Sequence, residues 1–176
     1  RRRLAPQQPA ALPEFALTLS RDGNLDIYTL ELATQSLSRV TSDDAIDTEP
    51  EWSRDGQSLY FTSDRAGNAQ IYRVALDGSR KADRVTFTNG YNARPRLSPD
   101  GSQLAWITWD HPRLPWQGTE LWLAEVQADG SLGTPRLVAG SASVSICQPE
   151  WSPAGVLHFV SDRSGWWNLY RLHGGA

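Results

Sequence analysis

Side chains that could act as a nucleophile or base are sparse in this sequence of 176 residues, which has three histidines and one cysteine, Cys147. A serine hydrolase needs a nucleophile within reach of a histidine, and its usual sequence sign is the elbow Gly-x-Ser-x-Gly. The nearest segment, residues 140–144, has Val144 where that motif requires its second glycine. A lone cysteine beside an apolar run is more typical of a small buried side chain. We therefore expect no catalytic residue.

The histidines and acidic residues also lack the spacing of a metal site. A zinc site needs closely spaced His and Cys ligands, and a calcium loop needs alternating Asp or Asn followed by a final Glu. The histidines are scattered at His111, His158 and His173. We interpret the recurring aspartates as caps of tight turns: Asp22, Asp26, Asp43, Asp44, Asp64 and Asp162. We expect no metal and no cofactor.

Charge and hydropathy exclude two further classes of partner. The formal net charge is -3, the pI is about 5.6, and the only basic run is Arg1–Arg3. This balance lacks the electrostatic attraction on which nucleic-acid binding depends. No apolar stretch approaches the roughly 20 residues of a membrane-spanning helix, so we expect no membrane insertion. The sequence contains no methionine, and we expect residue 1 not to be a translation start.

A repeated phrase organises the chain. It begins at Pro50 (PEWSRDGQSLYFTSDRAGNAQIYRV), at Pro95 (PRLSPDGSQLAWITWD) and at Pro149 (PEWSPAGVLHFVSDRSGWWNLYRL). The second interval is longer than the first because of an extra segment at residues 110–118. An earlier copy survives only in its second half, FALTLSRDGNLDIYTLEL. Self-similarity at a period of about 45 residues indicates a repeat architecture.

Each copy has the pattern of short antiparallel strands. Its apolar runs alternate with period two and end at Gly, Asp, Asn or Pro, as in the turn Arg54-Asp55-Gly56. Four such strands per repeat are typical of a β-propeller blade. We predict an all-β, partial or small propeller of about four blades, the first and last incomplete. The predicted blades follow a poorly matched segment, residues 1–13, and cover residues 14–42, 47–90, 92–139 and 147–174.

The aromatic residues fall into two groups. Blades pack face to face, so we expect the strand aromatics to form the core: Tyr60, Phe61, Tyr72, Trp106, Trp122, Phe159 and Tyr170. Four tryptophans lie in or beside loops, where they either form a contact surface or pack locally: Trp109, Trp116, Trp166 and Trp167.

The repeat sequences resemble those of two protein families. The segments LTLSRDGNLDIYTLEL, IDTEPEWSRDG, LYFTSDRAGNAQIYRV and RVTFTNGYNARPRLSPDG, in residues 15–104, closely resemble the propeller of TolB, the periplasmic component of the Tol-Pal cell-envelope system. From Pro95 to about residue 174 the sequence is similar to that of the N-terminal propeller of prolyl-oligopeptidase-type serine peptidases. The two overlap at SPDGSQLAW, which suggests a composite chain joined near residues 98–106.

The resemblance implies a ring with more blades than this chain offers. An open arc would expose unpaired strand edges and an apolar blade face. We therefore expect either self-association through blade faces or marginal stability as a monomer.

The same resemblance indicates where a partner would bind. Residues just before each repeat proline should line the mouth of the central channel: Asp47, Glu49, Asn92, Arg94, Ile146 and Gln148. Their mixed polar character suits recognition of a protein or peptide, and TolB-like propellers hold the peptidoglycan-associated lipoprotein at one channel face. The alternative is that these residues are only solvated.

Three functions remain open on the sequence alone. The leading one is a non-catalytic, periplasmic, protein-binding propeller resembling TolB. The second is the substrate-gating propeller of a prolyl-oligopeptidase-type peptidase without its catalytic domain. The third is a composite chain with no native function.

Overall fold

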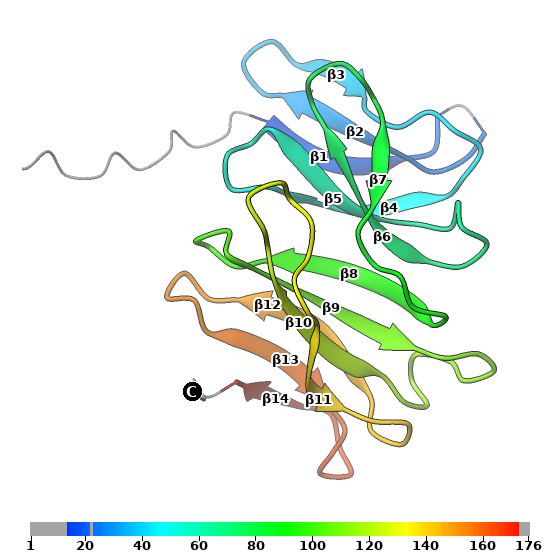
Figure 1. The fold of residues 1–176 in the computed structure, drawn as a ribbon, viewed down its shortest axis with the longest axis vertical. Helices are drawn as coiled ribbons and strands as arrows, with labels where there is room; N and C mark the ends of the chain where they lie inside the picture. Colours follow the sequence, from blue (N-terminus) through cyan, green and yellow to red (C-terminus); the bar gives the residue numbers. More distant parts are fainter. Residues whose placement is uncertain (1–13, 22, 173–176) are drawn as a thin grey trace, which may run out of the picture.

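The computed structural model describes residues 14–21 and 23–172, which form β-strands and no helix. The strands make four antiparallel sheets, each built from consecutive strands in chain order (Figure 1). The expected all-β class is confirmed. The segment 1–13, Asp22, His173 and the end of the last predicted blade lie outside the described residues.

The first sheet contains β1 (Glu14–Leu19), β2 (Asp26–Glu31) and β3 (Ser36–Arg39). The second contains β4 (Asp47–Trp52), β5 (Ser58–Ser63), β6 (Gln70–Ala75) and β7 (Ala82–Arg84). The third contains β8 (Tyr91–Leu97), β9 (Gln103–Trp109), β10 (Glu120–Glu125) and β11 (Arg136–Gly140). The fourth contains β12 (Ile146–Trp151), β13 (Leu157–Ser161) and β14 (Asn168–Arg171).

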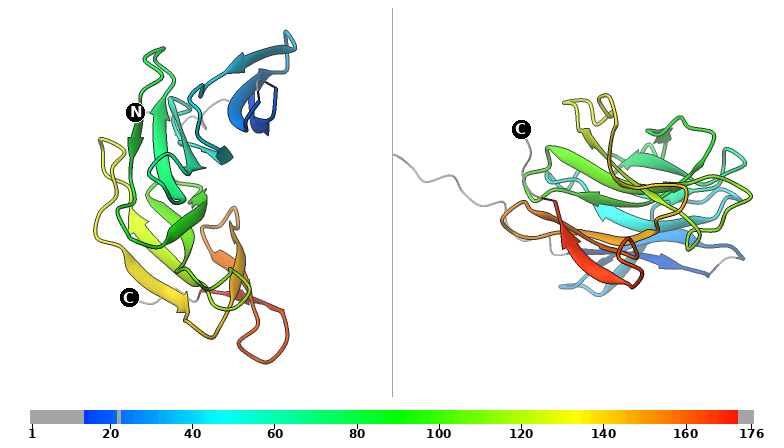
Figure 2. Two further views of the ribbon diagram at one scale, coloured as in Figure 1. Left: turned by 90° about the vertical axis from the view of Figure 1, so that its right-hand side faces the viewer. Right: turned by 90° about the horizontal axis from the view of Figure 1, so that it is seen from below.

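The four sheets stand side by side around a hollow and form an open arc (Figure 2, left). β4, β8 and β12 are the first strands of their sheets, and each contacts the next one along the arc. We call them the inner strands. Side chains on them are therefore brought together from three different repeats.

Tight turns set the register between each inner strand and its neighbour. In the third sheet, the Ser98 hydroxyl donates to the Asp100 carboxylate at 2.6 Å and accepts from the Gln103 N–H at 2.9 Å. Asp100 also accepts from the Ser102 N–H, and these hydrogen bonds lower the pKa of Asp100 to about 2. Gly101 has a φ of +74° in this turn, which favours glycine. The recurring Ser-x-Asp-Gly phrase is thus a self-contained turn.

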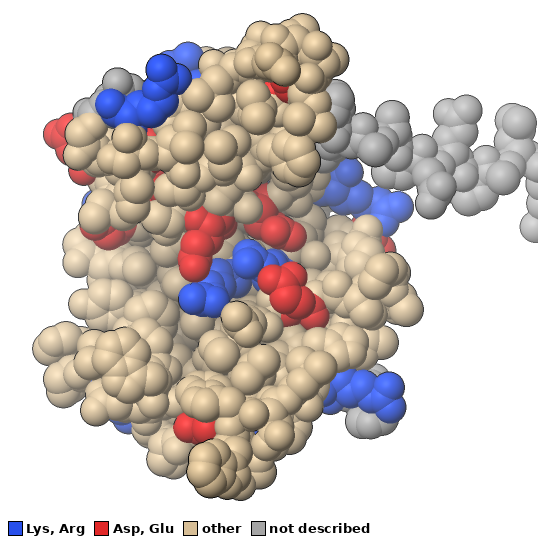
Figure 3. Space-filling view, turned by 180° about the vertical axis from the view of Figure 1, so that it is seen from behind, with Lys and Arg blue, Asp and Glu red and all other residues tan. Residues whose placement is uncertain are grey.

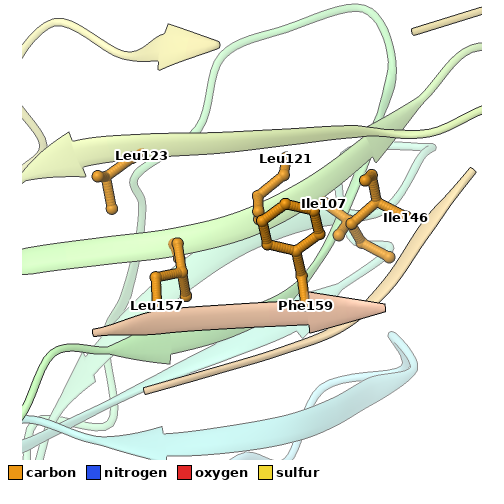
Figure 4. Packing of buried hydrophobic residues seen from close by; sticks show 7 residues of the cluster. Ile107, Leu121, Leu123, Ile146, Leu157 and Phe159 are labelled. Carbon is orange, nitrogen blue, oxygen red and sulfur yellow. The ribbon is translucent and has the colours of Figure 1, made fainter. Parts of the chain in front are cut away.

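The core lies between neighbouring sheets. Figure 4 shows the cluster that joins the third and fourth sheets, in which every side chain is 3% exposed or less: Ile107, Leu121, Leu123, Ile146, Leu157 and Phe159. Burying one such side chain stabilises the fold by about 1.5–3 kcal/mol. Of the predicted core aromatics, Trp122 and Tyr170 are only partly buried. The others are at most 6% exposed: Tyr60, Phe61, Tyr72, Trp106 and Phe159.

One outer strand is shorter than its sequence predicts. Residues 83–88 read as a strand, but β7 ends at Arg84. The Thr86 hydroxyl accepts the N–H of Ile71 at 2.9 Å, so a side chain replaces the ladder partner there. In the first sheet, Thr41 makes the same contact with the N–H of Ile27 at 3.0 Å. A threonine therefore ends the outer strand in both sheets.

Candidate functional site

Each inner strand is bulged at the residue that precedes its repeat proline. Glu49, Arg94 and Gln148 have φ values of +56°, +58° and +51°, and the pairing with the next strand shifts register at each of these points. Proline has no N–H to give to a sheet ladder, so a bulge is the natural place for it. The bulge turns the flanking residues away from regular alternation at the same level of three neighbouring strands.

Acidic and basic side chains gather in the middle of the face that looks into the hollow (Figure 3). The Arg94 Nε lies 3.5 Å from the Glu49 Oε1, and the Arg96 Nε lies 2.8 Å from the Glu150 Oε1. These pairs link β4 to β8 and β8 to β12. We use the name inner-face charge band for five residues: Glu49, Glu51, Arg94, Arg96 and Glu150.

The two glutamates of β4 also hold the backbone of β8. Glu49 Oε2 accepts from the N–H of Arg94 at 2.9 Å, and Glu51 Oε1 accepts from the N–H of Leu97 at 3.0 Å. Burial raises the pKa of Glu51, and the Glu150 carboxylate raises it further, against the opposing effect of the Leu97 N–H and Arg96. The charge band therefore joins neighbouring sheets as well as facing the hollow.

Two residues predicted at the channel mouth are buried instead. Asp47 and Asn92 are both 0% exposed. One terminal nitrogen of Arg65 donates to both carboxylate oxygens of Asp47, at 3.0 and 2.8 Å. Asn92 Oδ1 accepts from Trp106 Nε1 at 3.0 Å and from the Thr108 hydroxyl at 2.9 Å. Both side chains are used within the fold, so neither offers surface to a partner. Burial raises the pKa of Asp47 more than its Ser63 and Arg65 hydrogen bonds lower it.

The remaining residues predicted at the channel mouth differ in exposure: the one before the bulge is buried, and those at the bulge are accessible. Ile146 is 1% exposed and belongs to the core. The side chains of Glu49 and Arg94 are 32% and 41% exposed, and Gln148 is exposed. The prediction omitted Glu51, Arg96 and Glu150, which follow the repeat prolines. Their signal was available, since each of the three copies has a charged residue directly after its proline.

The loop tryptophans also separate into two kinds. Trp109 stacks on Tyr91, with ring centroids 5.5 Å apart and planes at 11°, and is partly buried. Trp116 and Trp166 are 64% and 80% exposed. The first is packed locally, and the other two are open to a contact.

In the part of the chain that the structure describes, no hydrogen bond joins Ser141, Ser143 or Cys147 to a histidine. Ser141 and Ser143 lie near one another, with their hydroxyls 3.4 Å apart. The Nδ1 of His158 contacts the carbonyl oxygen of Val156 at 3.0 Å. Burial raises the pKa of the Cys147 thiol, which disfavours the reactive thiolate.

Two wider absences hold for residues 14–21 and 23–172. No three His, Cys, Asp or Glu side chains gather there in a group that could hold a metal ion. None of the elements in that part is a helix long and apolar enough to cross a membrane.

Antiparallel sheets that stand around a hollow, each with its first strand on the inside, define a β-propeller, here seen as an open arc of blades. The chain belongs to the TolB β-propeller domain family, which matches residues 4–129. The match begins inside the segment 1–13 and continues through residues 98–106, where the resemblances to the two families overlap.

Curated relatives match different lengths of the chain. An uncharacterized protein of Agrobacterium fabrum is 29% identical over 140 residues, which is 77% of this chain and 46% of that protein. The Tol-Pal system protein TolB of Bordetella pertussis is 51% identical over 43 residues, or 24% of this chain and 10% of that protein. The chain thus spans less than half the length of these relatives.

Solved structures of two kinds resemble the arc. A puromycin-hydrolyzing peptidase of Mycobacterium tuberculosis has a TM-score of 0.73 and 27% identity, covering 92% of this chain and 28% of the peptidase. TolB of Acinetobacter baumannii has a TM-score of 0.66 and 28% identity, covering 85% of this chain and 37% of TolB. The predicted resemblance to both kinds of propeller, that of TolB and that of the peptidases, is therefore confirmed.

Proposed function

We propose that this chain is a non-catalytic, protein-binding propeller that works in the periplasm as TolB does, with the peptidoglycan-associated lipoprotein as its partner. Membership of the TolB propeller family supports this assignment. The observation that carries it is the inner-face charge band, which presents carboxylates and guanidinium groups of three blades on one concave surface.

The contact residues follow from exposure. Arg94 keeps 41% of its side chain accessible although it is paired with Glu49, and Gln148 and Glu150 are exposed on the next inner strand. A peptide lying in the hollow would meet hydrogen-bond donors on β8 and acceptors on β12. Because the charges are already paired within the arc, such a surface favours a polar, mixed-sign segment over a strongly charged one.

Calorimetric titration with the soluble part of the peptidoglycan-associated lipoprotein tests this proposal. We expect Arg94→Ala and Gln148→Ala to weaken binding about tenfold each, the effect of losing about 1.4 kcal/mol. Arg136→Ala is the matched control, since Arg136 is exposed on the outer strand β11. Failure of the wild-type chain to bind the lipoprotein would reject the partner. Equal binding by all variants would remove the inner face from the proposal.

A second function is favoured by the structural likeness to puromycin-hydrolyzing peptidases, which covers 92% of the chain. In that case the arc would act as a gate that filters peptides on their way to a hydrolase domain. A test is to mix the chain with a catalytic domain of that peptidase class and to measure cleavage of short and long peptides. Selective slowing of the long peptide supports the gate, whereas equal rates with and without the chain contradict it.

A further inference from the structure

The β5–β6 turn holds an arginine whose charge is fully used within the chain. The guanidinium carbon of Arg65 lies 5.4 Å from the ring centre of Phe61 and 4.9 Å from that of Tyr72. Its two terminal nitrogens pair with Asp43 at 2.9 Å and with Asp47 at 2.8 Å. Only 20% of the Arg65 side chain is exposed. Two aromatic rings and two carboxylates therefore surround this cation.

The β13–β14 turn, at the lower end of the molecule in Figure 1, repeats the sequence Ser-Asp-Arg-x-Gly. The guanidinium carbon of Arg163 lies 5.3 Å from the ring centre of Phe159 and 4.6 Å from that of Tyr170, which reproduces the stacking of Arg65. Arg163 is exposed, however, and within the described residues no carboxylate is paired with it. The same pair of aromatic rings therefore holds a guanidinium group whose N–H donors are not paired with a carboxylate of the described residues.

The difference arises in the loop that enters the inner strand. In the second sheet Asp64 accepts the N–H of Ile46 at 2.8 Å, and in the fourth Asp162 accepts the N–H of Ser145 at 2.7 Å. The two loops are therefore placed alike against their turns. Counted back from the repeat prolines, Asp43 and Asp47 correspond to Ala142 and Ile146. Both carboxylates are replaced by apolar side chains.

We propose that Arg163 binds a carboxylate of a peptide ligand, at the place that the Asp43 carboxylate takes beside Arg65. Ile146, at the position of Asp47, is 1% exposed and is packed in the core. Ala142, at the position of Asp43, is exposed and leaves room for a ligand carboxylate beside Arg163. The aromatic rings fix the guanidinium, so little side-chain freedom is lost when a carboxylate binds it through two parallel hydrogen bonds.

The same turn indicates what lies next to the carboxylate. Trp166 is 80% exposed and stands where Asn68 stands in the second sheet, directly after the turn glycine. Asn68 binds the carbonyl oxygens of Asn89 and Gly90, and an indole cannot replace those contacts. An exposed indole suits an apolar or aromatic ligand side chain. The ligand class is therefore a peptide with a carboxylate beside an apolar residue. This site does not depend on the inner-face charge band.

Titration by NMR with a small probe tests the site. The probe is N-acetyl-Ala-Phe with a free carboxylate, compared with the same dipeptide as its C-terminal amide. We expect shifts at the Arg163 side chain and the Trp166 indole with the free acid, and at least tenfold weaker binding of the amide. A third probe, N-acetyl-Asp-Phe-amide, tells whether a side-chain carboxylate is sufficient. Equal binding of acid and amide would overturn the proposal.

Four variants separate this site from general charge effects and from the inner face. Arg163→Gln should abolish the preference for the free acid. Ala142→Asp should abolish this preference too, because the new carboxylate would pair with Arg163 as Asp43 pairs with Arg65. Arg171→Gln is the control, since Arg171 is an exposed arginine of β14. Retained preference in Ala142→Asp, shown to be folded by its melting curve, would contradict the site. Arg94→Ala should leave it intact, so failure here is distinct from failure of lipoprotein binding.

Discussion

Trp52 and Trp151 hold the same position in the repeat, but only the indole N–H of Trp151 has a hydrogen-bond partner in the described structure. Trp151 Nε1 donates to the carbonyl oxygen of Arg96 at 3.0 Å, across the boundary between the third and fourth sheets. Trp52 Nε1 is buried without a partner. A buried, unsatisfied donor costs about 1–3 kcal/mol.

This asymmetry predicts opposite responses to one substitution. Trp151→Phe should lower the free energy of unfolding by about 1–2 kcal/mol, because the Arg96 carbonyl loses its donor. Trp52→Phe should be close to neutral or stabilising, because it removes an unsatisfied N–H and keeps most of the ring packing. Urea unfolding of both variants measures the difference. Equal losses would contradict the assignment of the two hydrogen-bonding states.

Asp47 should contribute far more to stability than Asp43, although both pair with Arg65. The Asp47 side chain is fully buried, whereas that of Asp43 is 45% exposed. Breaking a buried pair leaves Arg65 partly uncompensated, so Asp47→Ala should cost about 3 kcal/mol. Asp43→Ala should cost below about 1 kcal/mol. Chemical denaturation of both variants checks this, and similar costs would speak against it.

Glu51 should make stability depend on pH. Burial raises its pKa above the usual 4.5, so the folded protein holds this proton to higher pH than the unfolded chain does. Stability should therefore fall as pH rises from 4.5 through the raised pKa. Glu51→Gln should reduce this dependence and leave the part that comes from the raised pKa of Asp47. The amide oxygen of the variant can still accept the Leu97 N–H. Unfolding measured from about pH 4 to about pH 8 tests it. An unchanged pH profile in Glu51→Gln would exclude Glu51 as the source.

Asp100 should act in the opposite direction. Its hydrogen bonds lower its pKa from 3.8 to about 2, so its contribution is complete above 3.8 and is lost as pH falls through about 2. Asp100→Ala should cost about 1 kcal/mol at neutral pH, since it removes the partner of Ser98. The difference from the wild-type chain should shrink in acid. A cost that is constant down to about pH 2 would show that the carboxylate charge is not involved.

Leu169 reports on the free face of the fourth sheet. It is 71% exposed, whereas its counterparts Ile27 and Ile71 are 0% exposed between neighbouring sheets. If chains associate through this face, the mass measured by light scattering should rise with concentration. Leu169→Lys should then lower the association about tenfold or more, because it places a charge in an apolar contact. Arg136→Ala, at an exposed position of β11 in the third sheet, serves as the control.

The sequence by itself determined the strands, the turns and the repeat. These features depend on short-range rules: apolar residues alternate with period two, Asp and Gly occupy tight turns, and proline interrupts a ladder. The strand pattern from Pro50 onward was predictable for this reason. The end of β7 was not, because it depends on the Thr86 hydroxyl reaching Ile71 in another strand.

Only the tertiary structure decided which polar residues are accessible. Asp47 and Glu49 are two residues apart on one strand, yet the first is buried and paired with Arg65, and the second faces β8 at the bulge. Likewise, Arg65 and Arg163 have the same local sequence, and what differs is the loop entering β4 or β12. A side chain's partners come from segments that folding brings together. Local pattern placed these residues in turns and strands, and the packing of neighbouring blades determined their roles.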